Sequence, residues 1–412
     1  MGSFNTITND DIKETTSVLN QLVDFVEEDI SGSDTRKKFE VFITSSATYG
    51  ITSSLFHTVY DQNYRYQTAN ELFDITMGLR AGSATVTGSE IPEISPDRSG
   101  KLLFPSQSLM MREKVNIYRQ FAQLLLGDAN ASFTSPFTPV STADETEYTI
   151  DEALFLSFKR LFVRDGIKRE SFALKLFQSS SFGEVSTGDP LGVITGDQNI
   201  TISELHPASG SIILTDIGSS TSIERSQTGG DVGNLVNAAN TSENMGLIFY
   251  QQGIAVLDMK KVFNPNQFMT GSIFSVGEFS TTPISASFIP DFVVSASIDD
   301  VLDHVCSTRF GSGSYTTLTF QNNTKINSTL IFCRATADEF NFSSNPTYYD
   351  TDNNNKIVVI QDGSEGVQKS FSFVTTIGLY DAGEELLAVA KLSRPVEKND
   401  EKDLTFRVRL DF

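Results

Sequence analysis

The segment Leu404–Phe412 alternates without interruption between apolar and polar side chains, and this is the clearest structural signal in the chain. Successive side chains of a β-strand point to opposite faces of a sheet, so the alternation predicts a strand with one buried face. Its apolar positions are Leu404, Phe406, Val408, Leu410 and Phe412. Burying them would contribute about 1.5–3 kcal/mol for each side chain that is fully covered.

Two further strands are predicted directly before this segment. They are Ser370–Tyr380 and Glu385–Ser393, which are joined by the turn Asp381-Ala382-Gly383. Pro395–Asp403 then leads to the last strand. The sequence therefore predicts an antiparallel meander of three consecutive strands.

The first strand of this meander has an irregular pattern. Val374, Ile377 and Leu379 cannot all face one side of a strand that alternates strictly. We therefore expect a β-bulge in this strand or burial on both of its faces.

Short strands are also predicted in the middle of the chain. Apolar residues alternate at 172–176, and short apolar runs occur at 200–202 and 212–214. By contrast, Gly218–Ser242 is rich in Ser, Gly, Asn and Thr, which predicts a long exposed loop.

A hairpin is predicted where Leu247–Tyr250 and Ile254–Leu257 flank a three-residue connection that ends in Gly253. Such a connection is typical of a hairpin with a bulge. Two later strands are predicted at Tyr315–Phe320 and Thr329–Arg334.

Four segments have the features of helices. Asn9–Glu28 and Ser106–Leu126 each carry apolar residues on one helical face. Thr149–Val163 begins with Thr149-x-x-Glu152, which fits a capping box, and a short helix is predicted from Ser297 to Cys306.

The expected fold class is α+β, predominantly antiparallel β with a few helices in the N-terminal third, and several domains are expected for 412 residues. Residues 1–165 are predicted to form a domain of mixed helices and strands, which includes a strand at Lys38–Thr44. Residues 166–290 are predicted to form a β-rich domain with long loops. Residues 291–412 are predicted to form a domain with a helix followed by antiparallel strands. Gly311–Ser314 is expected to be a flexible joint.

The charge of the chain restricts its partners. The formal net charge is −21 and the pI is about 4.5, and no stripe of Lys and Arg interrupts the acidic composition. Such a surface repels nucleic acid phosphates and anionic lipids, so no direct nucleic acid binding is expected. Membrane insertion is not expected either, because no run of about 18 apolar residues occurs.

The chain has only two cysteines, Cys306 and Cys333, which excludes a scaffold of many disulfides and favours synthesis in a reducing cytoplasm. The two cysteines can in principle pair with each other. We find no secretory signal and no run of about 18 apolar residues.

No motif in the sequence indicates an enzyme. The three histidines, His57, His206 and His304, have no metal-ligand spacing, and nucleophile elbows and phosphate-binding loops are absent. Gly311-Ser312-Gly313 lacks the strand-to-helix context that phosphate binding needs. We therefore expect no catalytic residues, no cofactor-binding residues, no metal site and no cofactor.

Two weaker possibilities remain open. Asp350–Asn355 begins like a calcium-binding loop, but Asn355 replaces the Gly and Gln361 stands in place of the bidentate Glu, so a solvated hairpin tip is expected. A pair of carboxylates suited to glycoside hydrolysis is also compatible with the many acidic residues.

Several segments resemble virion proteins of large contractile-tailed bacteriophages, including those that infect marine cyanobacteria. Two lie in the N-terminal third, at Ser54–Gln62 and Arg112–Ala122. The strongest are Phe340–Tyr348, Ile377–Asp381 and Leu386–Pro395, and the last is also similar to strand pairs of phage tail-fibre and baseplate-attachment proteins.

The resemblance implies a structural subunit of a tailed phage virion, located in the tail or baseplate. It also implies a late protein, which is made and assembled into the virion in the cytoplasm of the bacterial host. It implies other virion structural proteins as partners and a homo-oligomer. A neck or capsid position is the near alternative. A receptor- or glycan-binding adhesin is another, for which Tyr348-Tyr349 is the local aromatic candidate. A polysaccharide hydrolase is a third.

Overall fold

The computed structural model describes residues 4–26, 36–40, 54–60, 63–87, 109–137, 148–159, 165–182, 205–207, 210–221, 224–269, 284–310, 316–343, 345–350, 352, 356–357, 360, 363–364 and 367–411. The predicted strand at 200–202, the second half of the one at Lys38–Thr44 and the joint at Gly311–Ser314 lie outside these residues.

The chain forms two compact units. The first, here called the terminal unit, consists of Met1–Val18 and Lys325–Phe412, and the second, the central unit, is Leu19–Thr324. The predicted boundaries after residues 165 and 290 do not separate compact units, because both lie within the central unit. Strands from the two sides of residue 165 pair in one sheet, as β5 (Glu152–Phe158) does with β14 (Ile254–Asp258).

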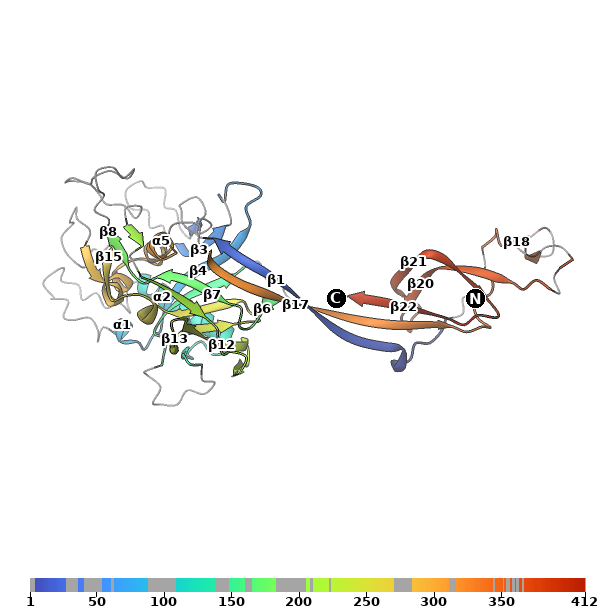
Figure 1. The fold of residues 1–412 in the computed structure, drawn as a ribbon, viewed down its shortest axis with the longest axis horizontal. Coiled ribbons are helices and arrows are strands. Elements are labelled where there is room, and N and C mark those ends of the chain that lie inside the picture. Colours follow the sequence, from blue (N-terminus) through green and yellow to red (C-terminus); the bar gives the residue numbers. More distant parts are fainter. Residues whose placement is uncertain are drawn as a thin grey trace. The chain divides into compact units, whose positions relative to one another are not determined.

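The fold is predominantly antiparallel β, as predicted (Figure 1). Among the described residues, fourteen strands form one sheet whose main path is β2-β3-β4-β5-β14-β13-β12-β10-β7-β17-β1. The strands of this sheet are β1 Ile12–Val26, β2 Arg36–Glu40, β3 Ser54–Tyr60, β4 Glu71–Leu79, β5 Glu152–Phe158, β6 Asp165–Ile167, β7 Ala173–Phe177, β10 Ser211–Thr215, β11 Glu224–Ser226, β12 Gly230–Asn237, β13 Asn240–Phe249, β14 Ile254–Asp258, β17 Thr316–Ala335 and β22 Leu404–Asp411.

Short strand pairs complete the β-structure. They are β8 Ser180–Phe182 with β9 Leu205–Pro207, β15 Asn266–Met269 with β16 Ile284–Ser287, β18 Tyr349–Asp350 with β19 Lys356–Ile357, and β20 Phe371–Tyr380 with β21 Leu386–Asn399.

Several predicted strands of the central unit are confirmed, among them β7 and β10. The hairpin of β13 and β14 is also confirmed, and its Gly253 has a φ of 62°, a conformation that glycine adopts without strain. The loop predicted at Gly218–Ser242 is wrong, because β11 and β12 form there. Val232 and Leu235 of β12 are fully buried.

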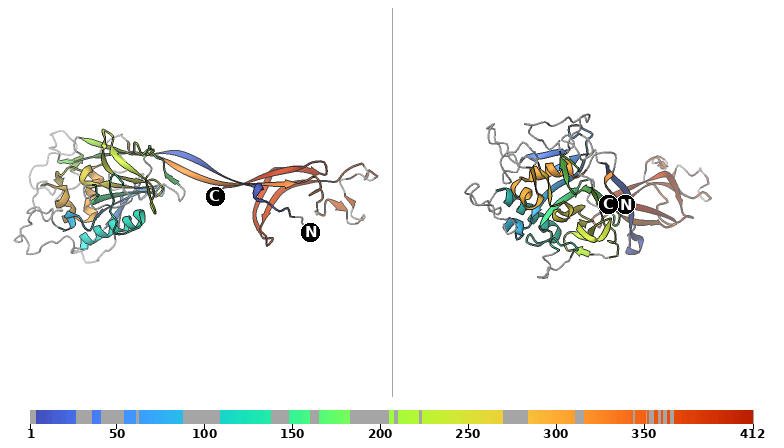
Figure 2. Two further views of the ribbon diagram at one scale, coloured as in Figure 1. Left: turned by 90° about the horizontal axis from the view of Figure 1, so that it is seen from below. Right: turned by 60° about the vertical axis from the view of Figure 1, so that its left-hand side comes forward.

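The predicted helix at Ser106–Leu126 is confirmed as α2, Leu109–Leu126, and Gly127 follows it with a φ of 85°. This helix covers one face of the sheet (Figure 2). A Cβ atom on Gly78 of β4 would lie only 2.7 Å from the Tyr118 nitrogen, so glycine permits close approach of the helix. Phe121 stacks on Phe155 of β5 with ring centroids 4.0 Å apart.

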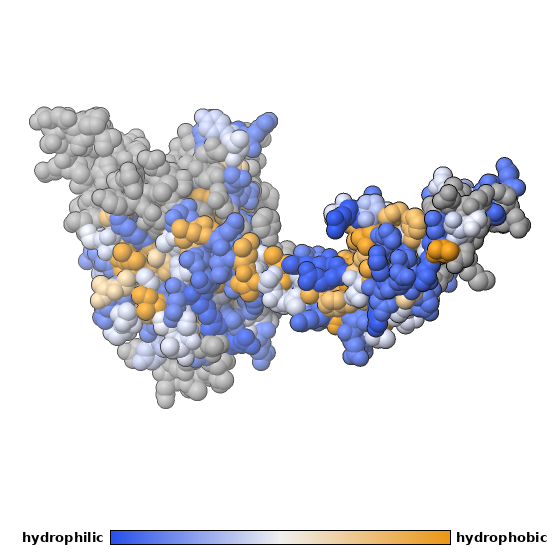
Figure 3. Space-filling model, turned by 45° about the vertical axis from the view of Figure 1, so that its right-hand side comes forward, coloured by the Kyte–Doolittle hydropathy of each residue, from blue (hydrophilic) through white to orange (hydrophobic). Residues whose placement is uncertain are grey.

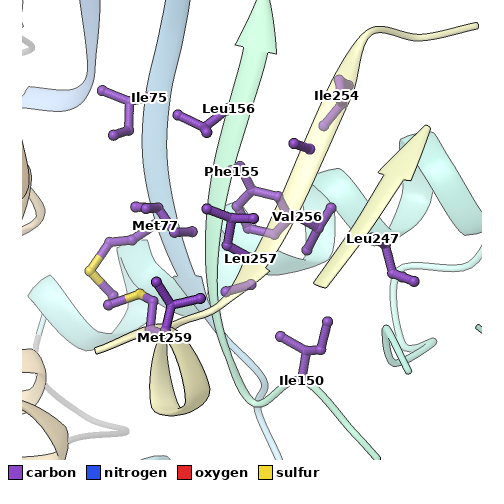
Figure 4. Close-up of a cluster of buried hydrophobic side chains, with 14 of the residues drawn as sticks. Ile75, Met77, Ile150, Phe155, Leu156, Leu247, Ile254, Val256, Leu257 and Met259 are labelled. Carbon is purple, nitrogen blue, oxygen red and sulfur yellow. The ribbon is translucent and has the colours of Figure 1, made fainter. Parts of the chain in front are cut away.

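The core of the central unit is formed by the strands around β5. Figure 4 shows Met77 of β4, Phe155 and Leu156 of β5, and Val256 and Leu257 of β14 within one buried cluster. Because successive residues point to opposite faces, Phe155 lies on the face covered by α2, whereas Leu156 lies on the other face.

The short helix predicted from Ser297 is confirmed as α5, Ile298–Thr308. The Ser297 hydroxyl accepts a hydrogen bond from the Asp300 backbone N–H at 3.1 Å, which caps the helix. The other helical segments are η1 Asn9–Asp11, α1 Ala84–Thr87, α3 Met259–Val262, η7 Phe288–Phe292 and α4 Val293–Ser295. The only two cysteines, Cys306 and Cys333, are not joined by a disulfide bond.

Two predicted helices are wrong. The described part of Asn9–Glu28, residues 9–26, forms η1 and then β1, which pairs with β17. Its apolar residues Val18, Leu19 and Leu22 are exposed rather than part of a core. Thr149–Val163 contains β5 instead of a helix. This strand is buried on both faces, and a fully buried strand has no alternation that distinguishes it from a buried helix.

The C-terminal strands are confirmed, but their pairing as a three-stranded meander is wrong. β20 pairs with β21, whereas β22 pairs with β17 over eight residues from Leu404 to Asp411. The expected irregularity is present, since the β20–β21 register shifts between Val374 and Thr376 and again between Leu379 and Tyr380.

Candidate assembly surface

The β20–β21 hairpin of the terminal unit has a buried inner face. Leu379 packs in a small core with Ile331 of β17 and Val408 of β22. The partly buried side chains around this core are Cys333, Ile377, Ala388, Ala390 and Leu410. Ile377 pairs with Ala390 and Leu379 with Ala388, so these four residues lie on one face of the hairpin.

The outer face of the same hairpin is also apolar, although it is exposed. Leu386, Leu387 and Val389 are 53%, 69% and 52% exposed, respectively. Phe4 meets the exposed Tyr380 ring edge-on, with centroids 5.0 Å apart. We call these five residues the outer apolar face, and Figure 3 shows hydrophobic side chains at the surface of the terminal unit.

The turn of the hairpin gives this face its shape. The Asp381 carboxylate accepts hydrogen bonds from the backbone N–H groups of Gly383 at 2.8 Å and Glu385 at 2.7 Å. The register shift after Leu379 places Leu386 opposite Tyr380. The strands therefore enter the turn with adjacent leucines that both remain exposed.

The three strongest segments of resemblance lie together in the terminal unit. Ile377–Asp381 and Leu386–Pro395 form the two strands of the hairpin near its turn. Phe340–Tyr348 packs at the opposite end of the hairpin, where the Tyr348 hydroxyl donates to the Phe371 carbonyl at 2.6 Å. The Ser372 hydroxyl likewise donates to the Phe340 carbonyl.

A buried lysine fixes the same end of the hairpin. Lys398 is fully buried, and its Nζ donates to the Asn341 Oδ1 at 2.8 Å, the Asn399 carbonyl at 2.7 Å and the Ala337 carbonyl at 3.2 Å. Because a buried ammonium group is costly without such acceptors, these bonds hold Phe340–Tyr348 against β21. Sequence reasoning missed this role of Lys398, since the acceptors lie up to 61 residues away.

The aromatic pair predicted for glycan binding is divided by the fold. Tyr348 is buried, whereas Tyr349 stacks with Phe342 at a centroid distance of 6.0 Å. Phe342 itself is 56% exposed. The exposed aromatic candidate is therefore Phe342, which stacks on the half-buried Tyr349.

The predicted hairpin tip, Asp350–Asn355, begins with Asp350 and Asp352, and the structure describes both of these residues. Asp350 pairs with Lys356 in the β18–β19 ladder, and the Asp352 N–H donates to the Asp350 Oδ1 at 3.0 Å. The structure thus brings the two ends of this segment together as an antiparallel strand pair.

The three histidines lie in different settings of the central unit. His57 is fully buried on β3 beside acidic residues of α5. His304 is also fully buried, and its Nε2 lies 2.8 Å from a nitrogen of the Arg309 guanidinium. Burial and the nearby Arg309 lower the pKa of His304 well below its ordinary value. His206 lies in β9.

Comparison of the chain with models of known protein families, with curated proteins and with solved structures gives no match. No helix within the described part of the chain has the length and apolar character needed to cross a membrane.

Proposed function

We propose that the chain is a structural subunit of a tailed bacteriophage particle, located in the tail or baseplate, and that it acts by binding other subunits and further copies of itself. The outer apolar face carries this proposal. It is a cluster of large apolar side chains exposed on a small unit, and such clusters mark surfaces that a partner covers.

The position of the resemblance supports the same function. The three strongest segments that resemble phage virion proteins form the hairpin and the loop packed against it, rather than a site with catalytic groups. In this proposal the chain has no enzymatic step, and its role in the particle is carried by exposed side chains such as those of Leu386 and Leu387. A neck or capsid position is the near alternative and uses the same surface.

Proteomic analysis of purified particles tests the proposal directly. We expect the protein in density-purified phage particles at a constant copy number relative to the major tail proteins. Its absence from particles that contain the full set of tail proteins would contradict the proposal.

The replacement Leu387→Lys is expected to reduce incorporation into particles by at least about tenfold while the melting temperature stays within about 2 °C. Leu387 is 69% exposed, so the lysine side chain fits in the free protein, but a buried unpaired charge at an interface is unfavourable. Complementation of a phage that lacks the gene, followed by quantitative mass spectrometry, measures incorporation.

Ser393→Lys is the matched control, because Ser393 is an exposed residue of the same strand outside the outer apolar face. Equal incorporation of the Leu387→Lys and Ser393→Lys proteins would show that the outer apolar face is not an assembly surface.

A glycan-binding adhesin is the second candidate, and the stacked Phe342 and Tyr349 favour it. An exposed aromatic ring such as that of Phe342 can stack on the apolar face of a sugar. Binding of the purified chain to host surface polysaccharide that is lost in Phe342→Ala, with assembly unchanged, would support this candidate over a purely structural role.

A further inference from the structure

We propose that His57 and Asp303 of the central unit bind a divalent transition-metal ion, with Asp299 orienting the imidazole. The proposal is independent of the role of the chain in a particle. Among the described residues, His57, Asp299 and Asp303 form a group whose potential ligand atoms all lie within 4.8 Å of one another.

The two carboxylates belong to one face of α5. Asp299 and Asp303 are four residues apart, so both side chains project from the same side of the helix. Their side chains are only 15% and 14% exposed. The Ser297 hydroxyl caps the first turn of the helix by accepting a hydrogen bond from the Asp300 backbone N–H.

The imidazole comes from the neighbouring sheet. His57 lies on β3 opposite Ile75 of β4, so both side chains are on the same face, which is the face opposite Gly78 and α2. Its side chain is fully buried, and Nε2 lies 2.6 Å from the Asp299 Oδ1. This short contact fits an Nε2–H that donates to the carboxylate.

The other ring nitrogen is the reason to infer a metal. His57 Nδ1 is buried without a hydrogen-bond partner and faces the Asp303 Oδ1 at 3.9 Å, which is too long for a hydrogen bond. If Asp299 takes the Nε2 proton, Nδ1 presents a lone pair toward a carboxylate, and a cation between the two would relieve this unfavourable arrangement.

The distances suit a small cation. Zinc binds nitrogen and carboxylate oxygen at about 2.0–2.2 Å, so two ligand atoms on a tetrahedral ion lie about 3.4 Å apart. The 3.9 Å between Nδ1 and Oδ1 needs only a small approach to reach this value. A metal-bound histidine usually donates a hydrogen bond from its other ring nitrogen to a carboxylate. Asp299 is in the position of that carboxylate, because it contacts His57 Nε2. Imidazole with carboxylate favours Zn²⁺ or Mn²⁺ over Ca²⁺, and water would complete the coordination.

The sequence contains no spacing that indicates this group, because His57 and Asp299 are 242 residues apart. Sequence reasoning accordingly treated His57 as a histidine without a ligand role, and only the packing of α5 against β3 brings the three residues together.

Titration of the full chain with metal tests the proposal. After dialysis against a chelator, the protein is titrated with ZnCl₂, MnCl₂ or CaCl₂ in an isothermal calorimeter, and its melting temperature is followed in parallel. We expect one zinc ion per chain and, at a free concentration of about 100 times Kd, a melting temperature raised by several degrees. Calcium should bind at least about tenfold more weakly.

Three isosteric variants separate the roles. Asp303→Asn, which removes the charge of a proposed ligand, and Asp299→Asn, which removes the negative charge of the group that accepts from Nε2–H, should each weaken zinc binding about 10–100-fold. Asp300→Asn is the matched control, since it is the adjacent acid of the same helix turn and belongs to the Ser297 cap. It should lower the melting temperature of the metal-free protein but keep the zinc affinity.

The absence of zinc binding by the folded wild-type chain at concentrations below about 1 mM would overturn the proposal, and His57 would then serve only to tie β3 to α5 through Asp299. Zinc binding with equal affinity in Asp303→Asn and Asp300→Asn would overturn it as well, because the metal would then bind elsewhere. Substitution with Co²⁺ gives an optical spectrum that reports nitrogen and oxygen ligation even if a variant is unstable.

Discussion

A chain that lacks Asp403–Phe412 is expected to lose the fold of its terminal unit and to fail in particle assembly, while the central unit stays folded. The deleted segment contains β22, which pairs with β17 from Ser328 to Ala335. Its Val408 is only 4% exposed and is one of the three residues at the centre of the terminal-unit core.

The size of this core sets the expected effect. Val408 and Leu410 of β22 are among the eight side chains of the core, and Leu404 and Phe406 are partly buried on the same face. At about 1.5–3 kcal/mol for each fully buried side chain, losing them costs several kcal/mol, which is comparable to the roughly 5–15 kcal/mol that stabilises a typical domain. The deletion also leaves the hydrogen-bonding groups of β17 without their partner strand.

Hydrogen exchange measured peptide by peptide distinguishes the two units. Amides of β20 and β21 should lose protection in the truncated chain, whereas those of β4 and β5 should retain it. If the truncated chain keeps protection in β20 and β21, melts near the full-length temperature and still enters particles, β22 is dispensable.

A pair of single replacements in β22 makes the same test without truncation. Val408→Asp places a carboxylate in the core and should unfold the terminal unit, because a buried unpaired charge is strongly unfavourable. Arg407→Asp places the same carboxylate on the exposed face of the same strand and should leave the unit folded. Similar loss of protection in both variants would show that the alternation of buried and exposed residues does not determine stability here.

β22 also illustrates what the sequence can predict. Its alternation identified the strand and its buried face, since Val408 is buried and Arg407 and Arg409 are exposed. Its partner strand was predicted wrongly as the strand directly before it. The alternation of side chains is a property of the segment itself, whereas the choice of a partner strand depends on distant parts of the chain. The true partner, β17, precedes β22 by about 70 residues of chain and pairs with it in an antiparallel register.

The two wrong helices have different physical causes. β1 is exposed along most of its length, so its apolar residues are not selected by burial, and their helical spacing carried no structural meaning. β5 is buried on both faces, so its apolar run has no period. In contrast, one face of α2 packs on β4 and β5 and the other faces solvent. Because only one face is buried, its apolar residues recur with the period of a helix, and the helix could be predicted from the sequence.

The candidate sites were less predictable than the strands. Leu386 and Leu387 read as ordinary strand residues, and nothing in the local sequence distinguishes an apolar side chain that packs inward from one that stays exposed. The register shift after Leu379 places Leu386 opposite Tyr380, so that Leu386 and Leu387 are both exposed, and that shift depends on the turn and on the partner strand.

Glu152→Gln is expected to stabilise the central unit at pH 8 by about 1–3 kcal/mol and to have a much smaller effect, below about 1 kcal/mol, at pH 5. Glu152 of β5 is buried, and its Oε1 accepts a hydrogen bond from the Thr85 hydroxyl while Oε2 is without a hydrogen-bond partner. Burial raises the pKa of this carboxyl to about 7, despite the opposing effect of the Thr85 hydrogen bond.

The sign of the pH dependence follows from this shift. The folded state holds the Glu152 proton up to about pH 7, whereas the unfolded chain releases it near the ordinary value of 4.5. Between these values the folded state binds more protons than the unfolded state, so stability falls as the pH rises through this window. This difference in pKa corresponds to about 3 kcal/mol as an upper limit. Asp258, whose pKa burial raises to about 6, adds a loss of the same sign at lower pH.

Urea unfolding followed by circular dichroism at pH 5 and pH 8 measures the effect. The amide introduced by Glu152→Gln imitates the protonated acid, so the variant should lose the part of the pH dependence that Glu152 causes. Asp24→Asn is the control for net charge, because it removes one carboxylate from an exposed position of the central unit and from the total of −21. If Glu152→Gln and Asp24→Asn change the pH dependence equally, general charge repulsion explains it. If only the Glu152 variant flattens it, the buried carboxyl is responsible.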